Sequence, residues 1–317
     1  MRYVARLTFS GPISIGSGDS SQGDSFHGVI HSDTLFSAIA NEWARTFEDE
    51  VPLDLLVERL NGSYPPFRIS SAFPYFGGDY YLPTPLGSSP IYHEKLRDVP
   101  FLGLFDFMEL AVGNEEYLRK RPLDDQLTDI VSPFVVPRVT IDRFTASTNI
   151  YQTSGHRFKP GGGLYFILEV NDEAIGKKLL SCIELLGGSG LGGERSVGYG
   201  RFTTEFIETD QLPGWNDVLN QSPEGASHWY SLALCCPRDH GEAKLARAYN
   251  LLTRKGWILS HSSMKQMKRR QCRMFGEGSI FNGAVHGMVA EVTPKDFEGE
   301  HRVYRYGIAL LLQIKRG

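Results

Sequence analysis

The stretch Gly187–Arg201, with the sequence GGSGLGGERSVGYGR, decides how the rest of this chain is organised. Seven of its first fourteen residues are glycine, and glycine tolerates positive φ angles and the close approach of another chain. Consecutive bare amide groups can form a concave anion site, to which Arg195 and Arg201 add planar cationic donors. The stretch is therefore typical of a loop that binds a phosphate chain. A mobile surface linker is the alternative.

The position of this loop excludes two common nucleotide-binding motifs. It follows a helix-like run that ends at Leu186 and precedes a strand-like run that begins at Phe202. A dinucleotide-binding loop has the opposite order, because its glycines follow a strand and open a helix. The chain also lacks the sequence G-x-x-x-x-G-K-[ST]. Nucleotide hydrolysis is not supported.

Composition indicates a soluble globular protein of two ordinary domains. The chain has 317 residues, of which 41% are hydrophobic and 22% are charged, and its net charge of −4 argues against a protein that coats nucleic acid non-specifically. No secretory signal or membrane-spanning apolar run is recognisable, so we expect a cytoplasmic protein without membrane contact. The four cysteines show no C-x-x-C spacing and are interpreted as buried, reduced thiols. They are Cys182, Cys235, Cys236 and Cys272.

The hydrophobic pattern predicts an α+β fold. The expected elements are a strand at 3–9, a helix at 35–47 capped by Ser32-Asp33-Thr34, strands at 68–76 and 79–83 around Gly77-Gly78, a strand at 163–170, a helix at 173–186 and a strand at 201–208. With a large insertion at about 84–160, this order is close to a split β-α-β-β-α-β, ferredoxin-like plan. We expect a first domain at 1–210, a linker at 211–227, and a smaller α+β domain at 228–317 that begins with a strand at 228–235 and ends with a strand at 306–314.

Residues 132–160 predict a two-stranded ribbon with a nucleic-acid-binding character. Val135–Ile141 and Ile150–Phe158 resemble its two arms, and the polar tip lies at 145–149. Basic and aromatic side chains alternate along it, which suits single-stranded nucleic acid because rings stack on bases while arginines neutralise phosphates. These side chains include Arg138, Arg143, Phe144, Tyr151 and Arg157. A solvated hairpin whose aromatic rings face the core is the alternative.

A second basic patch lies at Met264–Arg273, MKQMKRRQCR, which contains no acid. Its cations are Lys265, Lys268, Arg269, Arg270 and Arg273. At helical spacing most of them share one face, whereas in a strand they straddle both faces. RNA contact and a plainly solvated charged surface both remain open for this patch.

No arrangement of residues indicates a metal site or a known hydrolase motif. The aspartates of the insertion are dispersed, so a metal-dependent nuclease is not supported. A metal-independent ribonuclease would need a histidine as general acid or base, and His27 and His31 are the candidates because they precede the first helix. The amino terminus of that helix could instead hold a phosphate beside His31 and Ser32, or simply be capped.

Three motifs together resemble a known family. They are Ser32–Ile39 (SDTLFSAI), Gly190–Phe202 (GLGGERSVGYGRF), and Gly256–Ser260 (GWILS) followed by Gly276–Phe281 (GEGSIF). As a set they resemble the RAMP proteins of type III CRISPR effectors, most closely the fourth subunit of the Csm complex. The resemblance implies two ferredoxin-like (RRM-like) domains and no nuclease activity. It also implies that the chain caps the 5′ repeat-derived tag of the CRISPR RNA (crRNA) and joins the large palm-domain subunit to the first backbone RAMP subunit.

Site residues follow from the resemblance by position. It makes the 132–160 ribbon a thumb hairpin, with Phe144 as a wedge between bases, and it implies no cofactor, no metal and no direct DNA contact. Glu194 departs from the pattern, since many relatives have lysine there. The expected RNA-binding residues are Ser32, Arg138, Arg143, Phe144, Arg157, Gly188, Gly190, Gly192, Gly193, Arg195, Ser196, Arg201, Lys265, Lys268, Arg269 and Arg270.

Overall fold

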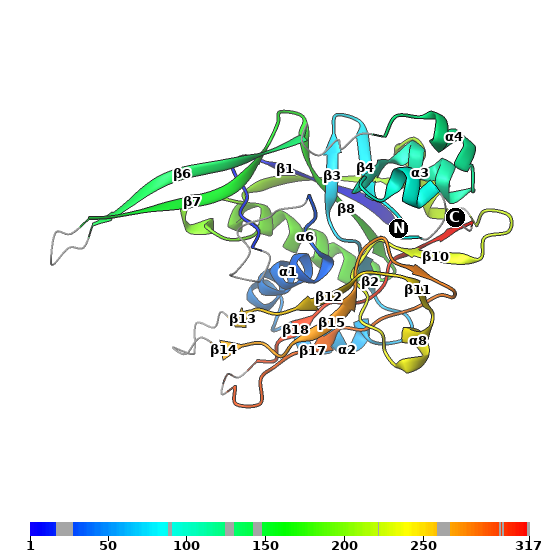
Figure 1. Cartoon of the computed structure of the whole chain (residues 1–317). Coiled ribbons are helices and arrows are strands. Elements are labelled where there is room, and N and C mark those ends of the chain that lie inside the picture. Colours follow the sequence, from blue (N-terminus) through cyan, green and yellow to red (C-terminus); the bar gives the residue numbers. More distant parts are fainter. Residues whose placement is uncertain are drawn as a thin grey trace.

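The fold was analysed in a computed structural model of the whole chain (Figure 1). The structure describes residues 1–16, 28–87, 91–123, 130–141, 148–220, 222–258, 267–297, 299 and 301–315. Within these residues it is a mixed α/β protein whose sheets are antiparallel. The expected α+β class is confirmed at this level.

The main sheet is built around the neighbouring strands β1 and β8. Its strands are β1 (Arg2–Phe9), β2 (Phe67–Ile69), β3 (Phe73–Phe76), β4 (Asp79–Pro83), β5 (Phe101–Gly103), β8 (Gly162–Val170) and β9 (Phe202–Glu208). They are ordered β5-β4-β3-β8-β1-β9, and β2 also pairs with β8. Strand β8 is almost wholly buried, as its apolar run predicts. The expected turn at Gly77-Gly78 joins β3 to β4, where Gly77 has φ 59°.

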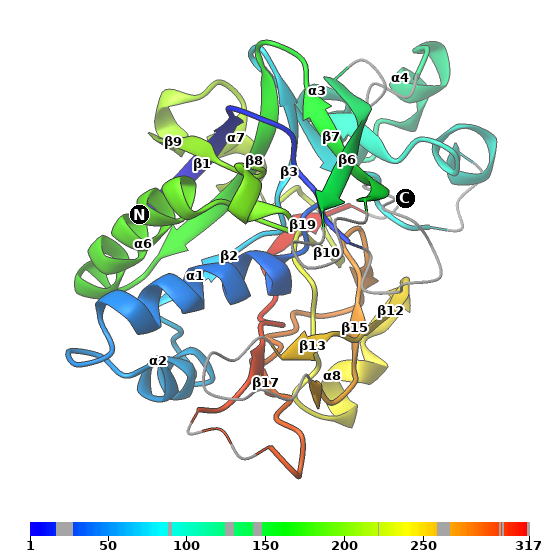
Figure 2. The same ribbon diagram turned by 90° about the vertical axis from the view of Figure 1, so that its left-hand side faces the viewer.

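Two long helices pack against each other beside this sheet (Figure 2). Helix α1 (Ser32–Thr46) buries Leu35, Phe36, Ile39 and Trp43, and α6 (Glu173–Ser189) buries an equivalent stripe that ends at Leu186. Both helices differ from expectation at one end. Helix α1 begins three residues early, so Ser32 and Asp33 belong to its first turn and do not cap it. The short helix α2 (Leu53–Leu60) follows α1.

The insertion between β4 and β8 contains a long projecting ribbon formed by β6 (Val131–Ile141) and β7 (Thr148–Phe158). The rest of the insertion comprises the π-helix Tyr92–Leu96, β5, α3 (Leu104–Ala111) and α4 (Glu115–Lys120). Strands β6 and β7 pair antiparallel from Val131↔Phe158 to Ile141↔Thr148 and extend away from the body of the molecule (Figure 1). The predicted ribbon is confirmed, although its tip lies outside the described residues.

The carboxy-terminal part is built from short strands. They are β10 (His228–Ser231), β11 (Ala246–Ala248), β12 (Leu251–Arg254), β13 (Trp257–Ile258), β14 (Met267–Lys268), β15 (Cys272–Phe275), β16 (Ile280–Phe281), β17 (Ala290–Glu291), β18 (Tyr304–Arg305) and β19 (Leu311–Ile314), with α8 (His240–Lys244) between β10 and β11. One sheet has the order β11-β16-β10-β19, and β12-β15, β13-β14 and β17-β18 form separate pairs. The strand expected at 306–314 is therefore shorter, and the one expected at 228–235 ends at Ser231.

The two parts share one continuous hydrophobic core, to which Tyr230, Tyr306 and Leu312 contribute from the carboxy-terminal side. Residues 211–227, expected as a linker, include the helix α7 (Trp215–Asn220). Trp215 is fully buried and packs edge-on against Tyr80 and Tyr165. Trp215 and Val218 therefore anchor this segment to the core, while its other described residues are exposed or half-buried.

Candidate nucleic-acid interface

The glycine-rich loop begins later than the sequence predicts. Helix α6 continues through Gly187 and Gly188 and is capped by Gly190, whose φ is 82° and whose N–H donates to Leu186 O. Gly187 belongs to the packing of α6, because a Cβ there would collide with Phe202 O. The assignment of Gly188 to the phosphate-binding loop is corrected, since its backbone lies within the helix.

The loop is fixed against the segment that follows β1. Gly193 N donates to Ser14 O at 2.7 Å, Gly200 N donates to Pro12 O at 2.8 Å, and Leu191 N donates to Gly200 O at 2.9 Å. Gly192 and Gly200 have φ angles of 96° and 72°, and a Cβ at either position would collide with a backbone carbonyl. The loop is therefore a fixed structure and not a linker.

One side of the loop presents unused amide donors to solvent. Glu194, Arg195 and Ser196 are exposed, and their N–H groups have no acceptor within the described part of the chain. The guanidinium groups of Arg195 and Arg201 likewise have no ion-pair partner among the described residues. Glu194 has the left-handed φ of 54° and is not paired with Arg195. Exposed amides beside an unpaired arginine form a local site for an anion.

The base of the β6–β7 ribbon adjoins this loop. Ile13, between Pro12 and Ser14, exchanges two backbone hydrogen bonds of 2.8 Å with His156 of β7. Tyr199 of the loop packs edge-on against Phe134 of β6, and the guanidinium of Arg138 lies 6.0 Å from the Tyr199 ring centre. Three elements that are distant in the sequence thus meet at one junction.

One face of the ribbon continues the junction with cationic and aromatic groups. Directly opposed residues share a face in an antiparallel ribbon, so Arg138 and Tyr151 lie on the same face as Phe134 and Arg157. Arg157 is exposed, and its guanidinium lies 4.5 Å from the Phe134 ring centre. The opposite face is aliphatic and exposed, with Val135, Val139, Ile141 and Ile150.

Three buried polar atoms at the junction have no hydrogen-bond partner in the described structure. They are Arg138 Nε, Thr153 Oγ1 and Tyr199 Oη. Buried polar atoms are almost always satisfied in folded proteins, so we expect an ordered water, or a side-chain movement on ligand binding, to satisfy these three atoms.

The expected phosphate position at the amino terminus of α1 is corrected. Ser32 is fully buried, its N–H donates to Ser71 Oγ at 2.8 Å, and its Oγ accepts from Leu234 N at 3.1 Å. His31 Nδ1 lies 2.9 Å from Glu277 Oε1, which also accepts from Ser71. Because Ser32 is buried and hydrogen-bonded to Ser71 and Leu234, it is not available to RNA.

A buried ion cluster beside Ser32 escaped the sequence analysis. Asp33 is fully buried and receives two hydrogen bonds of 2.9 Å from Arg254 and one of 2.5 Å from Arg305. Burial by itself raises the pKa of the Asp33 carboxyl, but Arg254 and Arg305 lower that pKa overall. The only sequence signal was a set of isolated charges in apolar surroundings.

The basic patch at 264–273 is extended in its described part, so its cations straddle two faces. Lys268 of β14 is exposed and lies 5.1 Å from the ring centre of Trp257 of β13, which is 51% exposed. Arg270 is exposed. Arg269 is half-buried, and burial together with Arg305 lowers its pKa to about 10. The sequence analysis quoted Trp257 only as part of the GWILS motif and missed it as a candidate RNA contact.

Four predicted residues lie outside the described residues. They are His27, Arg143, Phe144 and Lys265. Their roles stay predictions.

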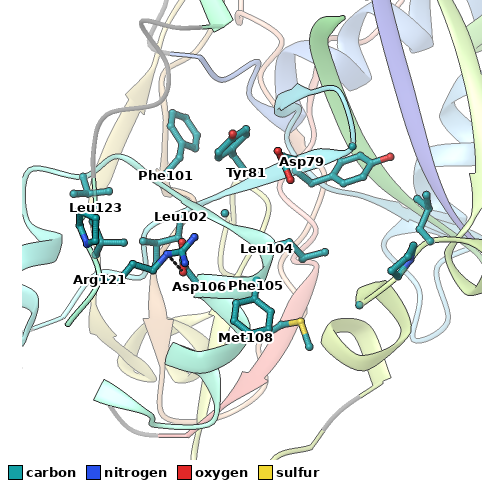
Figure 3. A pocket seen from close by; sticks show the side chains of 18 of the residues that line it. Asp79, Tyr81, Phe101, Leu102, Leu104, Phe105, Asp106, Met108, Arg121 and Leu123 are labelled. Carbon is teal, nitrogen blue, oxygen red and sulfur yellow. Dashed lines mark ion pairs between the residues drawn. The ribbon is translucent and has the colours of Figure 1, made fainter. Parts of the chain in front are cut away.

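A separate pocket of about 690 Å³ opens between β4, β5, α3 and Leu212–Gly214 (Figure 3). Its walls are mainly apolar, and an ion pair of 2.7 Å between Arg121 and Asp106 lies on one side. None of the predicted RNA-binding residues lines it. In the described residues, no group of three metal-ligating side chains is present, and no helix is long and apolar enough to cross a membrane.

Solved structures show where this fold occurs. A chain of the Csm3–Csm4 subcomplex of a type III-A CRISPR-Cas interference complex matches with a TM-score of 0.68 and 20% identity, covering 99% of this chain and 100% of that one. A chain of a Csm1–Csm4 cassette in complex with cA4 matches with a TM-score of 0.62 and 23% identity, covering 100% and 99%. The fold is thus that of subunits from type III CRISPR effectors.

Sequence comparison shows which of these subunits the chain resembles. Residues 224–314 match the model of the CRISPR Csm4 C-terminal domain. The CRISPR system Cms protein Csm4 of Thermococcus onnurineus is 29% identical, with 92% of this chain and 93% of that protein covered. Csm4 of Streptococcus thermophilus is 26% identical over the same shares. The chain is thus similar to Csm4 proteins over about nine tenths of its length, as the three sequence motifs imply.

Proposed function

We propose that this chain is a non-catalytic RNA-binding subunit of a type III-A CRISPR effector complex, in which it binds and caps the 5′ repeat-derived tag of crRNA. Similarity to Csm4 proteins supports the complex, and one structural observation carries the binding role. The glycine-rich loop, the segment 12–14 and the base of the ribbon are hydrogen-bonded into one junction that displays unpaired arginines and free amides.

The junction offers a different group for each part of an RNA strand. The amides of Glu194–Ser196 and the guanidinium of Arg195 suit a phosphate, because both donate to its oxygens. Arg138 lies beside the buried Tyr199 and has no ion-pair partner among the described residues, so its terminal guanidinium nitrogens can donate to the next phosphate or to a base. The exposed Tyr151 offers a ring for stacking on the same ribbon face.

The architecture supports the two-domain plan of this proposal. Strands β9-β1-β8-β2 with helices α1 and α6 have the order and antiparallel pairing of a split β-α-β-β-α-β unit. In this interpretation residues 1–210 are a ferredoxin-like domain, the β6–β7 ribbon is its thumb, and residues 228–317 are a smaller second domain. Arg143 and Phe144 at the ribbon tip keep their proposed roles as RNA contact and base wedge.

The solved structures of similar chains indicate which subunits this chain contacts. Chains of this fold have been solved in a Csm1–Csm4 cassette and in a Csm3–Csm4 subcomplex. We infer that this chain likewise bridges the large palm-domain subunit and the backbone RAMP subunit. The exposed aliphatic ribbon face at Val135, Val139 and Ile150 supports a role in assembly, because large apolar side chains are normally covered in a complex.

The alternative function is a metal-independent endoribonuclease that processes precursor crRNA. His31 would be its general acid or base, since it is partly exposed and oriented by Glu277. The His31 ring is directed toward Glu277, on the side of the carboxy-terminal part and not of the glycine-rich loop. The scaffold role is favoured because the free donors are gathered elsewhere.

The deciding experiment measures binding of labelled crRNA with an intact or deleted 5′ tag, with and without the co-expressed partner subunits. Replacing Arg138 and Arg195 together by alanine should remove tag-dependent binding. It should also reduce the salt dependence, by about 0.7 in log–log slope for each phosphate that the variant no longer neutralises. Arg59→Ala is the matched control, since Arg59 pairs with Asp172 on a remote surface.

Each competing function predicts a different result in the same experiment. Tag-independent binding by the unaltered chain, or unchanged binding by the double variant, would contradict the capping role. Cleavage of precursor crRNA by the unaltered chain, and its loss in His31→Ala, would establish the nuclease instead.

A further inference from the structure

Two of the four cysteines lie in contact although 36 residues separate them. The Sγ atoms of Cys236 and Cys272 are 3.6 Å apart, and both residues are only partly buried. Cys182 and Cys235, by contrast, are fully buried. The adjacent positions Cys235 and Cys236 therefore differ, because only the second has a thiol neighbour that solvent can reach.

The surrounding backbone holds each thiol from a different side. Cys236 N donates to Gly307 O, and Cys236 O accepts from Met288 N, both at 2.9 Å. Cys272 is paired with Arg254 in the β12–β15 ribbon, and its side chain packs against a small apolar cluster. The proximity of the thiols is thus fixed by the tertiary structure.

We propose that Cys236 and Cys272 form an oxidative modification site, which a peroxide-class oxidant converts into an intramolecular disulfide. A disulfide bond is about 2.0 Å long, so the two sulfur atoms need to approach by roughly 1.6 Å. No residue of the proposed RNA junction at the glycine-rich loop takes part, whereas Cys272 lies at the end of the basic patch 264–273.

The environment assigns a separate role to each thiol. The hydrogen bond from Cys236 lowers the pKa of Cys272, and Arg305 acts in the same direction, although burial opposes both. The Cys272 thiolate attacks one peroxide oxygen and becomes a sulfenic acid, while the other oxygen leaves as hydroxide and takes a proton to form water. The Cys236 sulfur then attacks the Cys272 sulfur, the disulfide forms, and the sulfenic oxygen leaves as a second water. Two thiols are oxidised for each peroxide that is reduced.

The test uses the full reduced chain treated with hydrogen peroxide. Remaining thiols are then alkylated with N-ethylmaleimide in denaturant, and intact mass and peptide maps are recorded. We expect two fewer maleimide adducts, a protein mass that is lower by two hydrogen atoms once the adducts are subtracted, and a linked peptide pair containing Cys236 and Cys272. Dithiothreitol should reverse all three changes. Closing this loop should also raise the melting temperature by about 5 °C.

Variants separate the proposed roles. Cys272→Ser should abolish the intramolecular disulfide, Cys236→Ser should leave a Cys272 sulfenic acid that dimedone traps, and Cys182→Ala should behave like the unaltered chain. Two results from the unaltered chain alone would overturn the proposal, so it stays testable if a variant does not fold. These are a disulfide between two chains, or oxidation of Cys272 while Cys236 still reacts fully with maleimide.

Discussion

Replacing Asp33 by alanine tests how strongly the buried ion cluster joins the amino-terminal helix α1 to the carboxy-terminal part. Asp33 is fully buried, and Arg305 is only 7% exposed, so the variant leaves a guanidinium without its counter-charge. Breaking a buried ion pair in this way costs about 3–5 kcal/mol of unfolding free energy. For a chain of 317 residues, that corresponds to a fall in melting temperature of about 5–8 °C.

Calorimetry and urea unfolding measure this loss. Lys177→Ala is the control, since Lys177 forms an exposed ion pair with Glu173 and should give no measurable change. If Asp33→Ala is as stable as the control, the cluster does not hold the two parts together and the reasoning from burial is refuted.

The pH dependence provides a second readout of the same cluster. The pKa of Asp33 is lowered from 3.8 in the folded chain, so its stabilising contribution is fully present above that pH. The contribution is lost as the pH falls through the lower folded pKa. Asp33→Asn should therefore lose stability at neutral pH and show a smaller further loss on acidification than the unaltered chain. Parallel pH profiles for the two proteins would contradict this assignment.

Three further substitutions test the proposed interface and its loop. Trp257→Ala should weaken single-stranded RNA binding by about 1–3 kcal/mol in a filter-binding titration, while Trp257→Phe should keep most of the stacking. Equal affinity of the unaltered chain and both variants would remove Trp257 from the interface. Glu194→Gly should raise the unfolding free energy by roughly 0.5–1 kcal/mol in urea, because it relieves the φ of 54°, and should tighten RNA binding; a loss of stability would contradict the strain. Gly200→Ala should lower the unfolding free energy by about 2 kcal/mol or more in the same assay, because the new Cβ meets Leu191 O. Gly188→Ala should not lower it, because a Cβ there meets no neighbouring atom. Similar values for the two variants would show that the loop adjusts.

The candidate site was predictable where a local pattern defined it. The ribbon with Arg138 and Arg157 could be recognised from the sequence because alternating basic and aromatic residues encode one strand face. Ser32 was misassigned, because a serine before an apolar helix has the same local signature whether it meets solvent or another element. Trp257 was quoted only as part of the GWILS motif and not as an RNA contact, since a single tryptophan gives no sequence signal for exposure.

Sequence alone determined most of the elements and the resemblance to Csm4. Apolar periodicity indicates which face of a strand or helix is buried, so β1, α1, α6 and the ribbon followed from local rules. The glycines predicted a loop at 187–201, and the structure moved its start to Gly190. Only the tertiary structure decided what those faces meet. The interactions of Asp33 with Arg254 and Arg305, and of Cys236 with Cys272, join positions remote in the chain. Such interactions depend on how the two parts pack around their shared core, which a local pattern does not specify.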